Sequence, residues 1–239
     1  ILSKNEKQIE TSTIAEARAG SYGEIYSVVG YVTAGTDNEY NTFFDTIYIQ
    51  DDTAGIDIFP YAESGLAIGT KIQVTGTLDQ YQGDKELRVI SYKILSDDTH
   101  IYEPQIVDTK TAMDYDALGG SLLQTSGIVT RVTLASDGTV SEFWIKDDTG
   151  VEAAIFIDGY IFSGTTGENT LADFVKVGAE VSAIGILYMH PEDDSEDSVP
   201  VFRVRNCDDI TLVSASADDS TSGGSSSSTG SSDSSSSSS

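Results

Sequence analysis

A short motif occurs twice in this chain, and it restricts the fold more than any other feature of the sequence. The first copy runs from Tyr48 to Ile56 and reads YIQDDTAGI, and the second runs from Trp144 to Val151 and reads WIKDDTGV. In each copy an alternation of aromatic and aliphatic residues leads into two aspartates, a threonine and a glycine. This pattern is typical of a strand, a tight polar turn and a second strand. The repetition predicts one module present twice.

Segments before and after this hairpin repeat as well, at a spacing that is nearly constant and then jumps once. The matching pairs are residues 29–33 with 126–130, and residues 68–76 with 177–185. A single jump indicates one insertion in the second module, around residues 162–177, between its third and fourth strands. Within the insertion, residues 170–176 are expected to form a short capped helix.

Five strands are expected in each module. In the first module they span residues 25–35, 42–50, 55–60, 70–79 and 84–95. In the second they span residues 121–135, 139–147, 150–158, 179–189 and 199–213. Five strands with a loop or helix between the third and the fourth are the signature of the OB fold, a small Greek-key barrel. A sandwich of the immunoglobulin type usually has about seven strands and ranks second. The predicted fold class is therefore all-β, with two tandem five-stranded Greek-key OB-fold barrels.

A short helix is expected just ahead of each barrel. Thr13 is followed three residues later by Glu16, which is a capping-box pattern, and the helix it opens should run through Arg18 and end at Gly20. Residues 111–114, closed by two glycines, form a looser copy of the pattern. The expected organisation is a polar lead-in at 1–12, module one at 13–108, module two at 109–213, and a segment rich in serine and glycine at 214–239.

The last of these segments has nothing to bury, so it is expected to be a disordered linker or stalk. Such a tail usually joins a module to other domains of the same polypeptide, and we expect the chain to be a fragment of a longer product. No window approaches the roughly 18 consecutive apolar residues that a membrane helix needs, so membrane insertion is not expected. Cys207 is the only cysteine, which excludes an internal disulfide, and it is expected to be a buried residue of the last strand.

The charge balance restricts the partners. The 239 residues include 13 basic and 39 acidic ones, which gives a formal net charge of -26. A field of this sign repels polyanions, so it argues against tight binding of nucleic acid without regard to sequence.

Several segments of the first module carry a resemblance to a known family: Ile14–Arg18, Gly30–Thr33, the hairpin motif and Val74–Leu78. Together they resemble the OB-fold modules attached to secreted and cell-wall nucleases and phosphoesterases, mostly of Gram-positive bacteria. The resemblance covers most of residues 13–95, whereas the second module keeps fewer of the motifs. It implies a secreted or cell-surface location. It also implies that the catalytic domain is a separate segment outside this chain.

An OB barrel binds its ligand on the second and third strands and on the loops between strands 1 and 2 and strands 4 and 5. If Ile47, Ile49, Ile56 and Ile58 face the core, alternation turns the residues between them outward, including Tyr48, Asp57 and Phe59. The candidate ligand-binding residues are Tyr40, Phe44, Tyr48, Phe59, Tyr81, Lys85, Arg88 and Trp144. Their aromatic rings offer stacking surfaces for single-stranded nucleic acid or another extracellular polymer. The alternative, that they are half-buried barrel aromatics and packing between modules, stays open.

Acidic residues cluster in two kinds of place. The loop at 190–198 suits a calcium ion by its carboxylates, but it lacks the spaced ligands of an EF-hand, and a solvated acidic loop is the simpler interpretation. No cofactor is expected beyond this Ca²⁺ alternative. Asp51 and Asp147 are interpreted as turn residues whose carboxylates accept nearby backbone amides.

No catalytic constellation is found in the sequence. His100 and His190 are the only histidines, and neither has the partners of a zinc site. The sequence has no serine elbow and no phosphate-binding loop. The leading hypothesis is a non-catalytic tandem OB-fold binding module, accessory to an extracellular nuclease or phosphoesterase. The alternative is a surface interaction or spacer module that binds no polymer, and an intrinsic hydrolase is unsupported.

Overall fold

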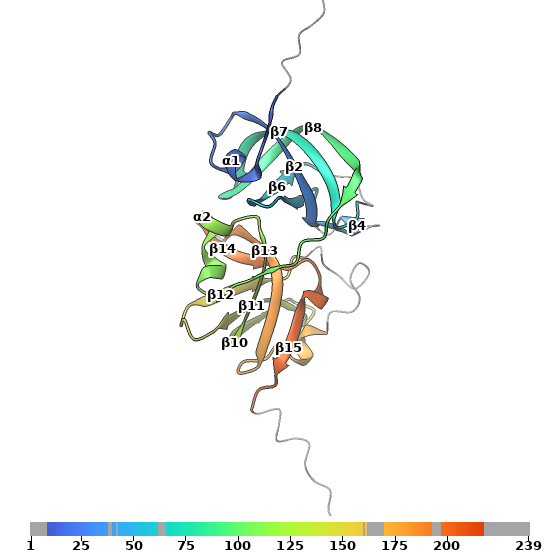
Figure 1. Ribbon diagram of the computed structural model, residues 1–239. Helices are drawn as coiled ribbons and strands as arrows, with labels where there is room; N and C mark the ends of the chain where they lie inside the picture. Colours follow the sequence, from blue (N-terminus) through green and yellow to red (C-terminus); the bar gives the residue numbers. More distant parts are fainter. Residues whose placement is uncertain are drawn as a thin grey trace, which may run out of the picture.

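The two halves of the chain fold as two closed β-barrels, one stacked above the other (Figure 1). The computed structural model describes residues 9–37, 40–41, 43–61, 66–159, 161, 170–192 and 197–217. Most of the lead-in and of the serine-rich tail lie outside the described residues, so their expected disorder stays a prediction. No helix in the described part of the chain is long and apolar enough to cross a membrane.

The first barrel has the topology expected of an OB fold. Its main strands are β2 (Ile25–Ala34), β5 (Ile47–Gln50), β6 (Gly55–Phe59), β7 (Thr70–Tyr81) and β8 (Asp84–Thr99). They pair in the order β2-β5-β6-β8-β7, and β7 pairs with β2 to close the barrel. Only the pair β6–β8 is parallel among these neighbours. The first module is therefore a closed barrel, and the sandwich of the immunoglobulin type, which ranked second in the prediction, is not observed.

The second barrel repeats this arrangement. Its strands are β10 (Leu122–Leu134), β11 (Val140–Lys146), β12 (Glu152–Phe156), β13 (Glu180–Pro191), β14 (Ser198–Arg203) and β15 (Ile210–Ser214). The order β10-β11-β12-β14-β13 closes through β13 onto β10, with a parallel pair between β12 and β14. The prediction of all-β tandem OB-fold barrels is confirmed.

Several boundaries differ from the prediction. The expected strand at 199–213 is two strands, because the short helix η3 (Cys207–Asp209) interrupts it, and β15 then pairs with β13. The strand expected from residue 42 begins at Ile47. Cys207 is buried as predicted, but it lies in η3 and not on a strand.

Short strands accompany the barrels. Two of them, β1 (Thr11–Ser12) and β9 (Gln105–Ile106), pair in parallel with β2 and β10. The repeat therefore extends to the chain that leads into each barrel. A small pair, β3 (Thr36–Asp37) and β4 (Tyr40–Asn41), follows β2.

The helix ahead of the first barrel is the one predicted. Helix α1 (Ile14–Arg18) opens with a complete capping box, in which the Thr13 side chain accepts from the Glu16 amide and the Glu16 carboxylate accepts from the Thr13 amide. The second copy is a 3-10 turn, η1 (Thr111–Met113), followed by α2 (Tyr115–Leu118). In the insertion, the expected capped helix is only η2 (Leu171–Asp173), which has no side-chain cap.

The repeated aspartates fix the turn of each hairpin and also hold the chain that precedes each barrel. Asp51 Oδ1 accepts from the amides of Thr53 at 2.8 Å and Ala54 at 3.0 Å, and its Oδ2 accepts from the Ile14 amide at 2.8 Å. Asp147 accepts from the amides of Thr149 at 2.8 Å and Thr109 at 2.9 Å. The interpretation as turn residues is confirmed. The bonds to Ile14 and Thr109 explain why the lead-in recurs together with the hairpin.

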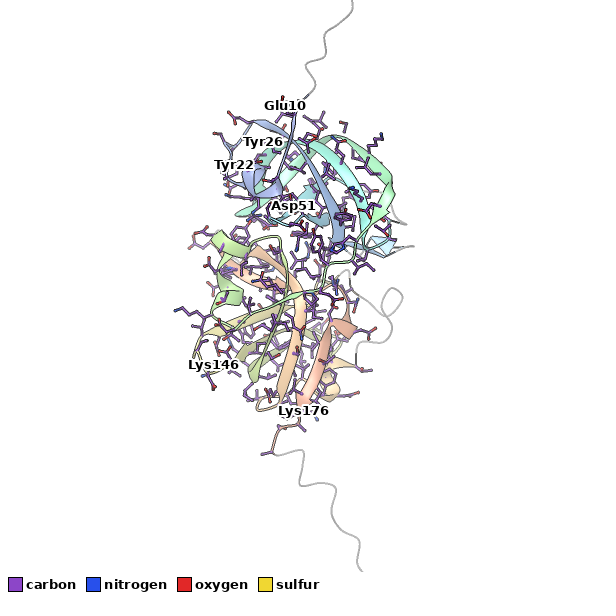
Figure 2. The ribbon with its side chains drawn as sticks, in the orientation of Figure 1. Glu10, Tyr22, Tyr26, Asp51, Lys146 and Lys176 are labelled. Atoms are coloured by element: carbon purple, nitrogen blue, oxygen red, sulfur yellow. The ribbon has the colours of Figure 1, made fainter. Side chains whose placement is uncertain are left out.

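The barrels are packed directly against each other. A Cβ atom built on Gly55 would overlap the carbonyl group of Gly120, so the two backbones touch where no side chain intervenes. Beside this contact the Leu122 amide donates to Gln50 Oε1 at 2.9 Å. Figure 2 shows Glu10 at the outer end of the first barrel and Lys176 at the opposite end of the second. The interface therefore lies between the two barrels' inner ends.

Candidate ligand pocket between the barrels

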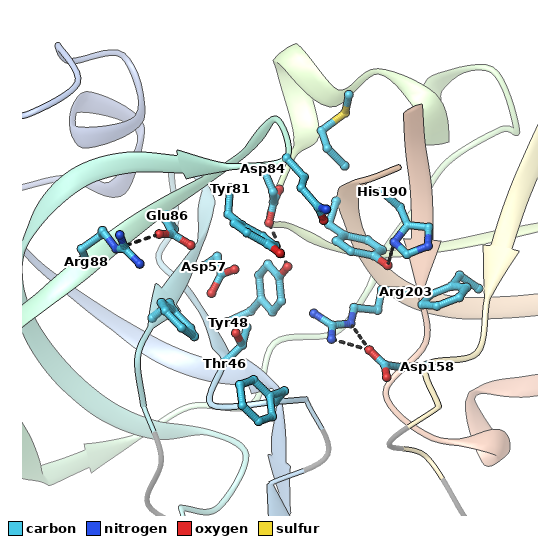
Figure 3. Close-up of a pocket in the computed structure, with 16 residues that line it drawn as sticks. Thr46, Tyr48, Asp57, Tyr81, Asp84, Glu86, Arg88, Asp158, His190 and Arg203 are labelled. Atoms are coloured by element: carbon cyan, nitrogen blue, oxygen red, sulfur yellow. Dashed lines mark hydrogen bonds and ion pairs between the residues drawn. The ribbon is translucent and has the colours of Figure 1, made fainter. Parts of the chain in front are cut away.

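A cavity of about 500 Å³ lies between the two barrels and is lined by both. The first barrel contributes residues of β5, β6 and the β7–β8 hairpin, and the second contributes the ends of β12, β13 and β14. Figure 3 shows the two groups facing each other, with Asp57 and Asp84 on one side and Asp158 and Arg203 on the other. These β5 and β6 residues belong to the face on which OB barrels bind ligands.

The β7–β8 hairpin reaches toward the second barrel through a tight turn. Gln82 and Gly83 both have positive φ, 51° and 87°, a combination that favours glycine at the second position. A Cβ on Gly83 would lie 3.5 Å from the Met189 side chain, so the turn rests against β13. The hairpin thereby places Tyr81 and Asp84 on the pocket.

Two tyrosines hold the buried Asp84. The Tyr48 hydroxyl donates to Asp84 Oδ2 at 2.9 Å, and the Tyr115 hydroxyl, from the second barrel, donates to Oδ1 at 2.7 Å. The Tyr115 hydroxyl in turn accepts from the Lys85 amide at 2.7 Å. Burial raises the pKa of Asp84 to about 6, although the two tyrosine hydrogen bonds act to lower it. One carboxylate therefore connects the barrels.

Asp57 stands beside this group with one oxygen unsatisfied. Its side chain is 7% exposed, and its Oδ1 has no hydrogen-bond partner in the described part of the protein. Burial, together with the charges of Asp84 and Glu86, raises the pKa of Asp57 well above its usual range, and Arg203 only partly opposes this. Burial also raises the pKa of Glu86, which pairs with Arg88 at 3.2 Å.

Arg203 occupies the centre of the opposite wall. Its Nε donates to Asp158 Oδ2 at 3.1 Å, and its Nη2 donates to the same oxygen. The guanidinium lies 3.7 Å from the ring centroid of Phe43, which belongs to the first barrel, and 5.0 Å from that of Tyr188. Arg203 thus connects the barrels by a cation–π contact as well as lining the pocket.

His190 is held as a neutral ring in the same wall. Its Nδ1 lies 2.9 Å from the Tyr188 hydroxyl, and its ring stacks on Phe156 with centroids 4.4 Å apart. Burial lowers the pKa of His190, and the charge of Arg203 lowers it further. The wall therefore carries no histidine charge at neutral pH.

The mouth of the pocket presents exposed aromatic rings. Tyr81 is 65% exposed and Phe44 is 61% exposed. Arg88 lies beside them, with its guanidinium 5.6 Å from the ring centroid of Phe59. Rings in this position are open to stacking by a ligand that enters from solvent.

The structure brings most of the sequence-predicted ligand-binding residues to this one pocket. Those that line it are Phe44, Tyr48, Phe59, Tyr81 and Arg88. Lys85 lies outside the lining and donates from Nζ to the Arg18 carbonyl at 2.8 Å. Trp144 lies on the second barrel beneath the Arg131 guanidinium, 3.7 Å from its ring centroid. Tyr40 belongs to β4, and its side chain lies outside the described residues.

Tyr48 and Asp57 turn outward from their own barrel, as the alternation predicts, but they are not open to solvent. Their alternation with Ile47, Ile49 and Ile58 does turn them away from the first core, but the second barrel covers the face on which they lie. Tyr48 is fully buried as a result.

The pocket residues of the second barrel could not be predicted from the sequence. Asp158, Tyr188 and Arg203 follow no motif, and only the docking of the barrels makes them neighbours of Asp57 and Asp84. Their strand ends correspond to the ligand-facing strands and loops of an OB barrel, which was the one usable signal.

Metal binding finds no support among the described side chains. Within that part of the chain, no group of three or more histidine, cysteine, aspartate or glutamate residues is arranged to hold a metal ion. The acidic loop at 190–198 falls partly outside the described residues, at 193–196, so the Ca²⁺ alternative there stays a prediction.

Comparison with known proteins yields similar folds but no family. No family model matches the chain, and no curated protein matches it in sequence. Among solved structures, a murine DNA-binding protein bound with double-stranded DNA is 10% identical, over 80% of this chain and 99% of that chain, with a TM-score of 0.34. A replication protein A heterotrimer bound to single-stranded DNA is 10% identical, over 84% of this chain and 51% of that chain, with a TM-score of 0.31.

A deletion mutant of the single-stranded DNA binding protein from Thermus aquaticus is 13% identical, over 75% of this chain and 90% of that chain, with a TM-score of 0.25. Likeness at this level identifies neither a family nor a ligand. The resemblance to modules of secreted bacterial nucleases stays a prediction.

Proposed function

We propose that the chain is a non-catalytic binding module in which two OB-fold barrels hold one small ligand, or the terminal unit of a polymer, between them. The observation that carries this proposal is the shared pocket, whose two walls come from different barrels. Hydrogen bonds through Tyr115 and the backbone contact of Gly55 with Gly120 fix the walls relative to each other. A volume of about 500 Å³ is within the range of small-molecule sites.

The packing of the barrels favours a short ligand over a strand that runs across the module. An OB barrel binds an extended strand along its second and third strands. In the first barrel these are β5 and β6, and Tyr48 and Asp57 on them are covered by the second barrel. A polymer therefore reaches this face only by inserting an end or a side group.

The chemistry of the pocket favours binding over catalysis. Asp158 is paired with Arg203, and His190 is bonded to Tyr188, so these groups are already committed to fixed contacts. No serine or cysteine is found among the described lining residues. The chain incubated with nucleic acid and phosphate esters in the presence of divalent metals is expected to show no turnover. Clear turnover would make it an enzyme and contradict the proposal.

Binding in the pocket is tested by ¹H–¹⁵N NMR spectra of the full chain titrated with diamines, monosaccharides and nucleosides. At least one class is expected to shift signals of Tyr81 and Glu86 from the first barrel together with His190 from the second, because all three line one cavity. If no class shifts these signals at millimolar concentration, the binding function is overturned.

Single-stranded nucleic acid is the polymer that the exposed rings of Tyr81 and Phe44 would accept by stacking, at about 1–3 kcal/mol per base. The net charge of -26 opposes it. Fluorescence anisotropy with a labelled dT12 oligonucleotide at low salt shows whether stacking on the rings outweighs the repulsion by the net charge. Binding that falls steeply with salt and in Tyr81→Ala supports a nucleic-acid partner. No binding at high micromolar protein removes nucleic acid as the ligand.

The setting of the module is also part of the proposal. On the resemblance of the first module, we place the chain in a secreted or cell-surface bacterial protein, accessory to a nuclease or phosphoesterase domain. Sequencing the gene past the codon for Ser239 tests this. A catalytic domain of either class supports the accessory role, and a continuation with no such domain on either side contradicts it.

A rigid spacer is the second candidate function, and the close backbone contact of Gly55 with Gly120 favours it, because such a contact fixes the angle between barrels. A spacer predicts that the double variant Phe44→Ala and Tyr81→Ala leaves turnover of the host enzyme on polymeric substrate unchanged. A selective loss on polymeric substrate, with small substrates unaffected, supports the binding module instead.

A further inference from the structure

We propose that the pocket between the barrels selects an alkylammonium ion that carries N–H donors, such as one end of a diamine. The inference rests on the proposed function and names the class of ligand for the same pocket. It follows from the unsatisfied buried oxygen of Asp57, the sign of the charge and the aromatic lining.

The unsatisfied oxygen, Asp57 Oδ1, can accept a hydrogen bond from a ligand. Asp57 is more than nine-tenths buried, lines the cavity, and leaves Oδ1 without a partner in the described part of the protein. Leaving a buried acceptor unpaired is costly, so a native site of this kind is expected to receive a donor from elsewhere. The nearby Tyr48 hydroxyl is already committed to Asp84. A ligand with N–H or O–H groups would supply this donor.

The charges of the lining favour a cation over an anion. Asp57, Asp84 and Glu86 stand on one wall. Besides burial, the charges of Asp84 and Glu86 raise the pKa of Asp57, and the charge of Asp84 raises the pKa of Glu86. The two arginines among the described lining residues are already engaged. Arg203 is held by Asp158, and Arg88 is paired with Glu86 at the more exposed rim. A positive ligand relieves the repulsion among the carboxylates, whereas a phosphate would add to it.

The aromatic lining suits an organic cation with an alkyl stem. Tyr48, Phe59 and Tyr81 lie on the side of Asp57, and Phe156 and Tyr188 lie on the opposite wall. Ring faces attract a cation, and they also cover the apolar stem of an alkylamine. A quaternary ammonium ion would gain the ring contacts but has no N–H to donate to Asp57.

Binding is expected to depend on pH through Asp57 and the groups that face it, which are Tyr48, Asp84, Glu86 and Arg203. Burial and the neighbouring carboxylates favour the protonated form of Asp57 in the empty pocket. An ammonium ion favours the carboxylate, so binding releases a proton and the affinity rises as the pH rises from 5 to 8. The diamine itself stays protonated in this range because alkylamine pKa values are about 10.

The test is isothermal titration calorimetry of the full chain with butane-1,4-diamine at pH 8 and low salt. Asp57→Asn is expected to weaken binding by about tenfold to a hundredfold, because it removes the charged acceptor but keeps the shape. Asp173→Asn is the matched control, because Asp173 is exposed on η2, outside the pocket lining, and its affinity should stay within about twofold of the wild type. Tetramethylammonium is expected to bind at least about tenfold more weakly, and butane-1,4-diol not at all.

Glu86→Gln provides a second variant, whose expected effect is also weaker diamine binding, so the result does not depend on the folding of one mutant. Equal affinities of the wild type, Asp57→Asn and Glu86→Gln for the diamine would overturn the inference. Binding of Ca²⁺ in competition with the diamine at equal affinity would also overturn it, in favour of an inorganic cation. If a monosaccharide or nucleoside shifts the pocket signals and no diamine does, this inference fails while the binding function stands. If nothing binds, both fail.

Discussion

Tyr115→Phe removes a single oxygen atom that joins the two barrels. The Tyr115 hydroxyl donates to Asp84 Oδ1 and accepts from the Lys85 amide, both at 2.7 Å. Asp84 is 4% exposed, so water does not readily replace the lost donor. Phenylalanine keeps the ring in its place between the barrels, and the change therefore isolates the two hydrogen bonds.

The expected loss follows from these two bonds. A hydrogen bond to a charged group contributes about 1.5–3 kcal/mol and one between neutral groups about 0.5–1.5 kcal/mol, so the variant should lose about 2–4.5 kcal/mol of unfolding free energy at pH 8. The loss should be smaller at pH 5. Asp84 has a pKa of about 6, so at pH 5 it is mostly protonated and its burial costs less.

Urea unfolding followed by fluorescence and circular dichroism measures this loss. Tyr22→Phe is the matched control, because Tyr22 is 52% exposed on the side of the first barrel (Figure 2) and its change should stay within about 0.5 kcal/mol. Equal stabilities of the two variants at pH 8, or a larger loss at pH 5 than at pH 8, would refute the bridging role of Tyr115.

Three further predictions concern the same interface and the repeated turns. The raised pKa of Asp84 contributes stability that is present below its unfolded value of about 4 and is lost as the pH rises through 6. The wild type should therefore lose stability relative to Asp84→Asn as the pH rises. The difference in unfolding free energy, wild type minus variant, should be up to about 3 kcal/mol smaller at pH 8 than at pH 4, and a difference that does not change with pH would refute this. Gly55→Ala should force the barrels apart at Gly120 and destabilise the chain by about 1–3 kcal/mol in urea. Gly159→Ala, with no atom of the described residues within 4 Å of the new Cβ, should change little, and equal effects would count against the close contact. Asp147→Ala should cost about 1–2 kcal/mol in thermal or urea unfolding because it removes the hydrogen bonds that the amides of Thr149 and Thr109 donate to this side chain, and an unchanged midpoint would show that these bonds are dispensable.

The barrels themselves were predictable because their determinants are local. Ile47, Ile49, Ile56 and Ile58 alternate along two strands, and all four are fully buried in the first core. The same alternation and the same Asp-Asp-Thr turn recur in the second module, so each copy supports the other. The capping box of α1 was readable for the same reason, since its donors and acceptors lie three residues apart.

The candidate site was predictable only on the side of the first barrel. Local alternation turned Tyr48 and Asp57 away from their own core, but whether water or protein covers them depends on the docking of the second barrel. Arg203 contacts Phe43, a residue far away in the sequence, and no spacing rule connects the two. From the sequence, Gly120 was interpreted as a residue that ends a helix. In the structure it also packs against the backbone of Gly55.

The central claim is that the two barrels form one rigid unit with a shared pocket. Residual dipolar couplings of backbone amides, measured for the full chain in one alignment medium, test it most directly. If the interface at Tyr115, Gly55 and Gly120 holds in solution, one alignment tensor should fit the couplings of both barrels in the arrangement described above. Two tensors that differ in magnitude or orientation would show that the barrels move independently, and the shared pocket would then not exist as described.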